Sequence, residues 1–250
     1  MNGATSSNLT AKPFAPEPRV PGCLAVGGFT PLSTTDWPGK LAAVVFVQGC
    51  PWRCHYCHNP DLQARLVADT TRWHRVLDTL VQRVGLLDGV VFSGGEPTLD
   101  AALPHAMRQV RDLGFEVGLH TAGLYPERLA RCLPLVDWVA LDVKTAFDDY
   151  EAVTAVRGSG EPVRHSLHRV LASAKPHELR TTWHPALLPD GALMRLADEL
   201  AEAGAHTWML QGYRPTPDTQ AALGAGWQMP PAALVSRLAR PGLTVQLRGT

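Results

Sequence analysis

The sequence has no excess of charge of either sign and no long apolar run. Lysine and arginine together number 23, as do aspartate and glutamate, so the formal net charge is zero. Because nucleic-acid-binding proteins usually carry a basic excess, this balance gives no reason to expect a nucleic-acid partner. The apolar run at residues 41–47 is far too short to cross a bilayer, and residues 1–20 lack the apolar segment of a secretory signal. We therefore expect a cytoplasmic protein without a membrane partner.

The number and spacing of the cysteines do not indicate a disulfide framework. The chain has five cysteines, an odd number, and three of them, Cys50, Cys54 and Cys57, fall within eight residues. This crowding argues against disulfides and favours metal ligation in a reducing compartment. Cys23 and Cys132 are isolated in the sequence, and we expect each to behave as a small buried hydrophobe.

The length and composition predict one folded domain preceded by a tail. The chain has 250 residues, of which 45% are hydrophobic, so it can bury a full core. Residues 1–20 are rich in serine, proline and alanine and predict a flexible tail. We expect residues 21–250 to form a single domain.

Strand and helix patterns alternate after a turn-rich stretch at residues 27–39. Short apolar runs predict buried strands, and apolar residues at helical spacing predict helices. The expected strands are residues 41–47, 89–93, 115–120, 138–143, 177–183, 207–211 and 243–247. The expected helices are residues 71–84, 100–113 (with Asp100 as its cap), 126–132, 147–174 with a break near 158–160, 190–203 and 232–238. This α/β alternation predicts a parallel sheet covered by helices, as a doubly wound sheet or a barrel, possibly a partial one.

Polar and glycine-rich segments recur directly after the expected strands. They are residues 50–58, 94–97, 120–123, Lys144 and 211–214. In a barrel of parallel strands all of these segments meet at one face, which is where such folds carry their chemistry. The sequence therefore predicts one shared site at the carboxyl ends of the strands.

The cysteine segment is the strongest single signal in the sequence. Cys50, Cys54 and Cys57 have the spacing C-x3-C-x2-C, so three thiolates on one loop can hold one face of an iron–sulfur cube. Three ligands leave the fourth iron open for a substrate, as an open position does in catalytic zinc sites. His58 follows at once, so a Cys3His zinc site is an alternative, as are three unligated cysteines.

A second motif, Gly94-Gly95-Glu96-Pro97, follows the next expected strand. Glycines lack a Cβ and let the backbone approach a ligand closely, and a carboxylate beside them can pair with an ammonium group. Alone, such a tetrapeptide is usually a turn. Its place about one β-α unit after the cysteine segment favours a role in the same site.

The two motifs together resemble those of the radical S-adenosylmethionine (radical SAM) superfamily, including the aromatic Tyr56 just before the third cysteine. The resemblance implies a partial (β/α)6 TIM-like barrel with a [4Fe–4S] cluster on the loop after the first strand. It also implies reductive cleavage of S-adenosylmethionine to methionine and a 5′-deoxyadenosyl radical, so that the reaction centres on the cofactors rather than on a catalytic side chain. In the superfamily the Gly-Gly-Glu-Pro motif binds the methionine amino end of the cofactor.

Four further segments resemble those of the glycyl-radical-enzyme activases, and among these enzymes the anaerobic ribonucleoside-triphosphate reductase activating proteins. The segments are residues 27–40, 57–60, 141–144 and 180–182. That family takes one electron from a donor such as flavodoxin or ferredoxin and abstracts a hydrogen atom from a glycine of a partner enzyme. The resemblance implies that Asp142 and Lys144 lie at the cofactor, with Lys144 as a point charge for its carboxylate.

The resemblance covers further residues near the expected site, but one position, His120, departs from the family's pattern. It implies an ordering role for Arg180, and nucleoside contacts for Gln211, Tyr213 and Arg214. Where relatives commonly carry Asp-Thr-Asn-Gly, this chain has His120 followed by Thr-Ala-Gly. In some activases that aspartate helps to hold a monovalent cation, and a neutral imidazole brings no charge, which puts such a cation site in question.

Two other functions compete with the activase. A radical SAM enzyme of similar length can act on a small molecule, such as a precursor of deazapurines. A zinc-stabilised interaction module without enzymatic activity would also account for the cysteines.

Overall fold

The strands of the sheet lie in the same order as they occur in the chain. The computed structural model describes residues 23–65, 70–217, 219, 223, 224, 226 and 228–249, so the expected tail at residues 1–20 lies outside the described residues. The eight strands run in the order β1 to β8, each bonded to its neighbour in sequence. They are β1 (Val26–Ser33), β2 (Ala42–Val47), β3 (Gly89–Gly94), β4 (Glu116–Thr121), β5 (Trp138–Asp142), β6 (His177–Trp183), β7 (Thr207–Gly212) and β8 (Thr244–Arg248).

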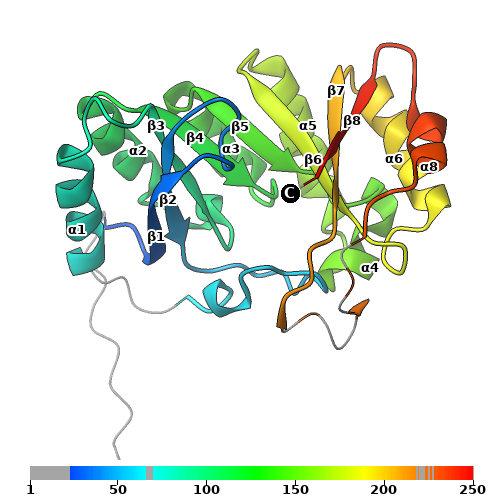
Figure 1. Cartoon of the computed structure of the whole chain (residues 1–250), viewed down its shortest axis with the longest axis horizontal. Helices are drawn as coiled ribbons and strands as arrows, with labels where there is room; N and C mark the ends of the chain where they lie inside the picture. Colours follow the sequence, from blue (N-terminus) through cyan, green and yellow to red (C-terminus); the bar gives the residue numbers. More distant parts are fainter. Residues whose placement is uncertain are drawn as a thin grey trace, which may run out of the picture.

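Helices follow most of the strands and cover the outer face of the curved sheet (Figure 1). The α-helices are α1 (Thr70–Val81), α2 (Leu103–Asp112), α3 (Pro126–Cys132), α4 (Tyr150–Thr154), α5 (Gly160–Ala172), α6 (Asp190–Glu202) and α8 (Ala232–Leu238). Strands β2 to β8 pair in parallel, and only β1 pairs antiparallel, with β2. With β1 and β8 at its two edges, the sheet forms a partial barrel, as expected.

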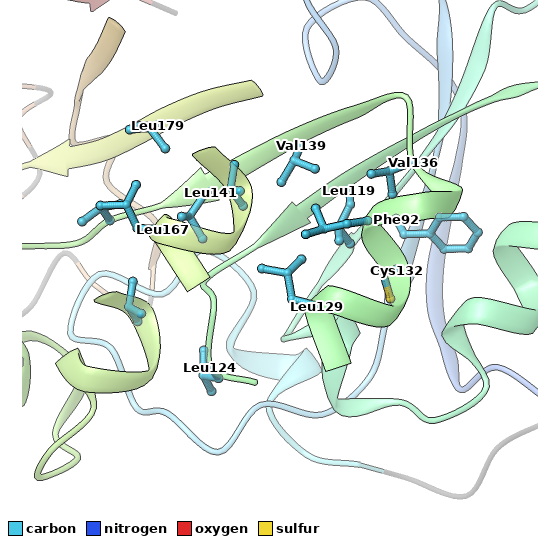
Figure 2. Packing of buried hydrophobic residues seen from close by; sticks show 14 of the residues in the cluster. Phe92, Leu119, Leu124, Leu129, Cys132, Val136, Val139, Leu141, Leu167 and Leu179 are labelled. Atoms are coloured by element: carbon cyan, nitrogen blue, oxygen red, sulfur yellow. The ribbon is translucent and has the colours of Figure 1, made fainter. Parts of the chain in front are cut away.

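Alternating side chains of each strand build two separate cores. On β2, Ala43, Val45 and Val47 face the helices, whereas Ala42 and Val44 face the barrel interior. This follows from the two-residue period of a strand. Figure 2 shows the outer core, where Phe92, Leu119, Val139 and Leu141 of the sheet pack against Leu129 of α3 and Leu167 of α5.

A tryptophan from the loop between β1 and β2 fills the interior at the amino ends of the strands. The Trp37 ring stacks on Trp138 with centroids 5.5 Å apart and an interplanar angle of 16°. It lies against two glycines: a Cβ on Gly89 would sit 2.8 Å from the Trp37 ring, and a Cβ on Gly118 would sit 2.9 Å from it. These two strand positions therefore have to be glycine for the tryptophan to fit.

Two local expectations differ from the structure. Residues 27–39 were expected to be turns, but β1 occupies the whole of their first half, because its backbone pairs with β2. Helix α2 begins at Leu103, three residues after Asp100. The Asp100 carboxylate accepts a hydrogen bond from the amide of Ala102 at 2.9 Å and another from the distant amide of Ala25 at 3.0 Å. It thus ties the start of β1 to the segment before the helix.

Within the described residues, no helix combines the length and the apolar character needed to span a membrane.

We predict that Trp37→Ala destabilises the protein by about 3–5 kcal/mol, the usual cost of deleting a large buried aromatic side chain. Trp37 is only 5% exposed, and its neighbours Gly89 and Gly118 have no side chains with which to fill the space. The measurement is urea unfolding monitored by circular dichroism. Leu32→Ala is the control, because Leu32 is 50% exposed and should shift stability by no more than about 0.5 kcal/mol. Equal effects of the two changes would contradict a packed interior.

Candidate functional site

The carboxyl ends of the parallel strands surround one cavity of about 250 Å³. All five segments that were expected to converge contribute to its lining. They do so through the cysteine segment after β2, the glycines after β3, His120 at the end of β4, Lys144 after β5, and Gln211 on β7. The five segments therefore line a single cavity at this face.

The segment from Cys50 to Cys57, called here the cysteine loop, leaves the end of β2 and is fixed before its first cysteine. Gly49 has a φ of +100°, a left-handed conformation that glycine adopts without strain. Its amide donates to the Leu62 carbonyl at 2.7 Å, and the Cys50 amide donates to Gln63 at 3.1 Å. In Figure 1 the loop, in light blue, runs from β2 towards α4.

The three thiols of the cysteine loop, those of Cys50, Cys54 and Cys57, all line the cavity. Burial raises the pKa of Cys50 to about 12, and burial also raises the pKa of Cys54. Without a bound cation both groups therefore keep their protons at neutral pH, and a metal group has to displace them on binding. Among the described residues, no three histidine, cysteine, aspartate or glutamate side chains lie close enough to share one metal ion. The three thiols line one cavity, and cysteine thiolates are the usual ligands of iron–sulfur clusters.

A cluster of charged side chains lies beside the cysteine loop. The Lys144 ammonium lies 5.3 Å from the centroid of the Tyr56 ring and 3.6 Å from Oδ2 of Asp142. Arg180 donates from Nε to Oδ1 of Asp142 at 3.1 Å. Burial alone would raise the pKa of Asp142, but Arg180 and Lys144 outweigh burial and hold that pKa below its usual value. The carboxylate is thus ionised, and it fixes two cations against the cavity.

The motif Gly94-Gly95-Glu96-Pro97, called here the glycine turn, packs against the start of the cysteine loop. Gly94 has a φ of +123°, and a Cβ there would lie 2.4 Å from backbone atoms of Val47. A Cβ on Gly95 would lie 2.5 Å from the carbonyl oxygen of Gly49. The two glycines line the cavity as expected, but the close approach that demands them is to the protein's own backbone.

The Glu96 carboxylate does not line the cavity and is fully buried. Its Oε1 accepts hydrogen bonds from the Thr98 amide at 3.1 Å, the Thr98 hydroxyl at 2.5 Å and the Thr121 hydroxyl at 2.7 Å. Its Oε2 accepts from the Ala122 amide at 2.9 Å. The carboxylate that we expected to face an ammonium group is instead bonded to four protein donors. It joins the glycine turn to the end of β4, and Pro97 is buried behind it.

His120 is packed at the end of β4 and takes no charge. Its Nε2 donates to the carbonyl of Asp36 at 2.7 Å, and its ring meets Trp138 edge-on with centroids 5.5 Å apart. Burial lowers the pKa of His120 to about 3, so the imidazole is neutral at physiological pH. Asp36 itself lines the cavity, which the sequence analysis missed, although Asp36 belongs to the segment at residues 27–40 that carries the family resemblance.

The remaining candidates divide between the cavity and its surroundings. Arg180 and Gln211 line it, and Gln211 donates to the Thr182 hydroxyl at 2.9 Å. Tyr213 is fully buried outside it, with its ring 6.4 Å from the ring of His58. The following residue, Arg214, accepts a hydrogen bond from His58 through its backbone carbonyl.

The isolated cysteines and the inner residues of the cysteine loop also have distinct places. Cys132 is buried in the outer core, and Cys23 packs against that core, so neither lines the cavity. Within the loop, Trp52 is buried and lines the cavity, whereas Arg53 is exposed and donates to the carbonyls of Cys50 and Trp52.

A family model described as the radical SAM superfamily matches residues 44–182, more than half of the chain. The chain belongs to the radical SAM superfamily. Members of this superfamily use a [4Fe–4S] cluster and S-adenosylmethionine, and the chain is an enzyme of this type. The matched residues include the cysteine loop, the glycine turn, Asp142 and Lys144.

Two relatives are named as activating enzymes. The chain is 34% identical over 175 residues to a putative glycyl-radical enzyme activating enzyme of Methanocaldococcus jannaschii, covering 66% of this chain and 70% of that protein. It is 33% identical over 129 residues to the pyruvate formate-lyase-activating enzyme of Clostridium pasteurianum, covering 49% of this chain and 54% of the relative. The chain thus spans about half the length of the second relative and more of the first.

Solved radical SAM structures share the fold at low sequence identity. A radical SAM methyltransferase from Sphaerobacter thermophilus aligns with a TM-score of 0.62 and 17% identity, over 87% of this chain and 69% of that one. QueE from Escherichia coli aligns with a TM-score of 0.53 and 18% identity, over 90% of this chain and 94% of that one. These likenesses support the partial barrel and say nothing of the substrate.

The pKa of His120 falls from 6.5 to about 3 on folding. At pH values between these two, the imidazole is protonated in the unfolded chain and neutral in the native protein. Stability should therefore decrease as pH falls below 6.5, by at most about 1.4 kcal/mol per pH unit from this residue. We predict that His120→Gln, which keeps a hydrogen-bond donor, loses about 1 kcal/mol less stability than the unaltered protein between pH 7 and pH 5.5. Urea unfolding at both pH values measures this, and equal losses would contradict it.

Thr121→Val removes one of the four donors to the buried Glu96 carboxylate while keeping the shape of the side chain. We predict a loss of about 1–3 kcal/mol in the free energy of unfolding, the cost of leaving a buried polar group short of a partner. Thr79→Val on α1 is the matched control, because that hydroxyl bonds to the Arg75 carbonyl at the surface. A loss no larger than the control's would show that Glu96 does not depend on Thr121.

Proposed function

We propose that this chain activates a glycyl radical enzyme. A [4Fe–4S] cluster held by Cys50, Cys54 and Cys57 of the cysteine loop would supply the electron for reductive cleavage of S-adenosylmethionine to methionine and a 5′-deoxyadenosyl radical. A glycine Cα of the partner gives up a hydrogen atom, which yields 5′-deoxyadenosine and leaves the unpaired electron on the partner's backbone. One electron from an external donor balances each turnover.

One observation carries the proposal: three thiols, a glycine turn and a paired lysine open into a single cavity at the carboxyl ends of the strands. The likeness to two proteins named as activating enzymes supports the choice among radical SAM reactions. One relative is named for pyruvate formate-lyase and the other for glycyl radical enzymes in general. The two names therefore support the class of reaction and do not identify the partner.

The chain's own residues divide this work among them. Cys50, Cys54 and Cys57 would hold the cluster, since their thiols line the cavity and no other cysteine of the described residues does. Tyr56 sits between the second and third of these cysteines, and its ring lies under the Lys144 ammonium.

The cofactor's polar groups would meet the charged side chains and the glycine turn beside the cysteine loop. Lys144 would pair with the methionine carboxylate, and Asp142 would keep Lys144 and Arg180 in place. The backbone of Gly94 and Gly95 would meet the methionine amino end. Glu96 and Pro97 would act from outside the cavity, by holding the turn in shape.

We propose anaerobic ribonucleoside-triphosphate reductase as the partner and flavodoxin or ferredoxin as the electron donor. The support is the resemblance of residues 27–40, 57–60 and 141–144 to that group of activases. The segment at residues 27–40 also carries Asp36, which lines the cavity, and Trp37, which fills the barrel below it.

Anaerobic reconstitution with iron and sulfide, followed by dithionite and S-adenosylmethionine, should give about four irons per chain and 5′-deoxyadenosine measured by chromatography. Cys54→Ala should abolish the product, because two thiolates cannot replace three. Cys23→Ala, which removes a thiol outside the cavity, should keep both iron and product. Product formation by Cys54→Ala at the level of the unaltered protein would overturn the assignment.

Electron paramagnetic resonance with anaerobic ribonucleoside-triphosphate reductase tests the partner. We expect a protein glycyl signal only when both proteins, S-adenosylmethionine and a reductant are present. Formation of 5′-deoxyadenosine without a glycyl signal from this reductase or from pyruvate formate-lyase would favour a small-molecule substrate.

Metal analysis tests the third function. Zinc without iron or sulfide in protein purified anaerobically would favour an interaction module.

A further inference from the structure

Helix α4, five residues long, lies between the cysteine loop and the end of β5. The last carbonyls of a helix have no partner within it. Here the Thr154 carbonyl accepts from the amide of Arg53 at 3.0 Å, and the Val153 carbonyl accepts from the amide of His55 at 3.3 Å. These two amides flank Cys54, so the end of α4 fixes the backbone on both sides of the middle cysteine.

The first residue of the same helix, Tyr150, bonds to the segment after β5 that carries Lys144. The Tyr150 hydroxyl accepts a hydrogen bond from the backbone amide of Lys144 at 2.8 Å. Tyr150 is 1% exposed, and its ring meets the Trp52 ring edge-on with centroids 5.9 Å apart. The Tyr150 ring also stacks on Phe147 with centroids 6.1 Å apart. One buried side chain thus touches both Lys144 and the cysteine loop.

The hydrogen bond from Lys144 matters because of where the strand ends. Lys144 lies two residues beyond the end of β5, and the Val143 amide before it is bonded to Arg180 of β6. The next amide is the one that turns to Tyr150, so the hydroxyl sets the direction in which the chain leaves the sheet. The Lys144 side chain then reaches back to Asp142 and the Tyr56 ring.

We propose that Tyr150 is a positioning residue that sets the placement of Lys144 relative to the cysteine loop, and so prepares the cavity for S-adenosylmethionine. This inference rests on the proposed function. The hydroxyl does not line the cavity, and it acts through the Lys144 backbone. Without it, part of the binding free energy of the cofactor has to be used to order Lys144.

The test uses Tyr150→Phe, which keeps the ring against Trp52 and Phe147 and removes only the hydroxyl. The reconstituted variant should hold the same iron and sulfide as the unaltered protein, and its reduced cluster should give the same electron paramagnetic resonance spectrum. On addition of S-adenosylmethionine the spectral change should require about three- to tenfold more cofactor, the factor that one hydrogen bond of ordinary strength represents. The KM for S-adenosylmethionine should rise by a similar factor, with a smaller change in kcat.

A second readout needs no cluster. In the protein without iron, hydrogen exchange of the peptide containing Lys144 should be faster in Tyr150→Phe, because its amide has lost its partner. Tyr125→Phe, which removes a half-buried hydroxyl outside the cavity, is the control and should change neither the exchange at Lys144 nor the cofactor titration.

The outcomes separate this inference from the proposed function. If Tyr150→Phe only lowers the melting temperature and titrates with S-adenosylmethionine as the unaltered protein does, Tyr150 is merely structural and the inference is overturned. If the unaltered protein binds a cluster and S-adenosylmethionine but forms no deoxyadenosine, the proposed function fails, while the titration and the exchange at Lys144 still decide the role of Tyr150.

Discussion

The site depends on the parallel pairing of β2 with β3 at their carboxyl ends. Val47 lies opposite Gly94 in the register, and beyond that pair the Gly95 amide donates to the Val47 carbonyl at 2.9 Å. The Glu96 amide then donates to the Gly49 carbonyl at 2.8 Å, one residue before the first cysteine of the loop. Because these bonds join the cysteine loop to the glycine turn, motifs about forty residues apart share one cavity. A side chain at either glycine would separate them.

The walls of the cavity are charged but balanced. Asp142 keeps its negative charge through Arg180 and Lys144, while His120 stays neutral and Glu96 is bonded to protein donors alone. A buried charge is tolerated when it is paired and hydrogen-bonded, and Asp142 meets that condition. The cavity can therefore take in a ligand without leaving the Asp142 carboxylate unpaired.

Local pattern was enough to find the strands that face two cores. Residues 138–143 were predicted within one residue of β5, because Trp138–Leu141 are apolar and buried on both faces of the sheet. Residues 177–183 coincide with β6, in which Leu179 and Trp183 are the buried apolar residues. Strand β1 was missed because Gly27, Gly28 and Pro31 indicate turns, and only pairing with β2 extends them.

The convergence of the site was predictable from topology, but its contacts were not. The Glu96 bonds to β4, the His120 bond to Asp36 and the Tyr150 bond to Lys144 depend on how side chains are packed in space, which no spacing in the sequence encodes.

The stacked Trp37 and Trp138 rings also affect how small molecules reach the cavity. Because they fill the barrel interior at the amino ends of the strands, we expect small molecules to enter and leave the cavity through the carboxyl face. A large protein docked over that face would keep a reactive intermediate sealed from water and oxygen until the protein leaves.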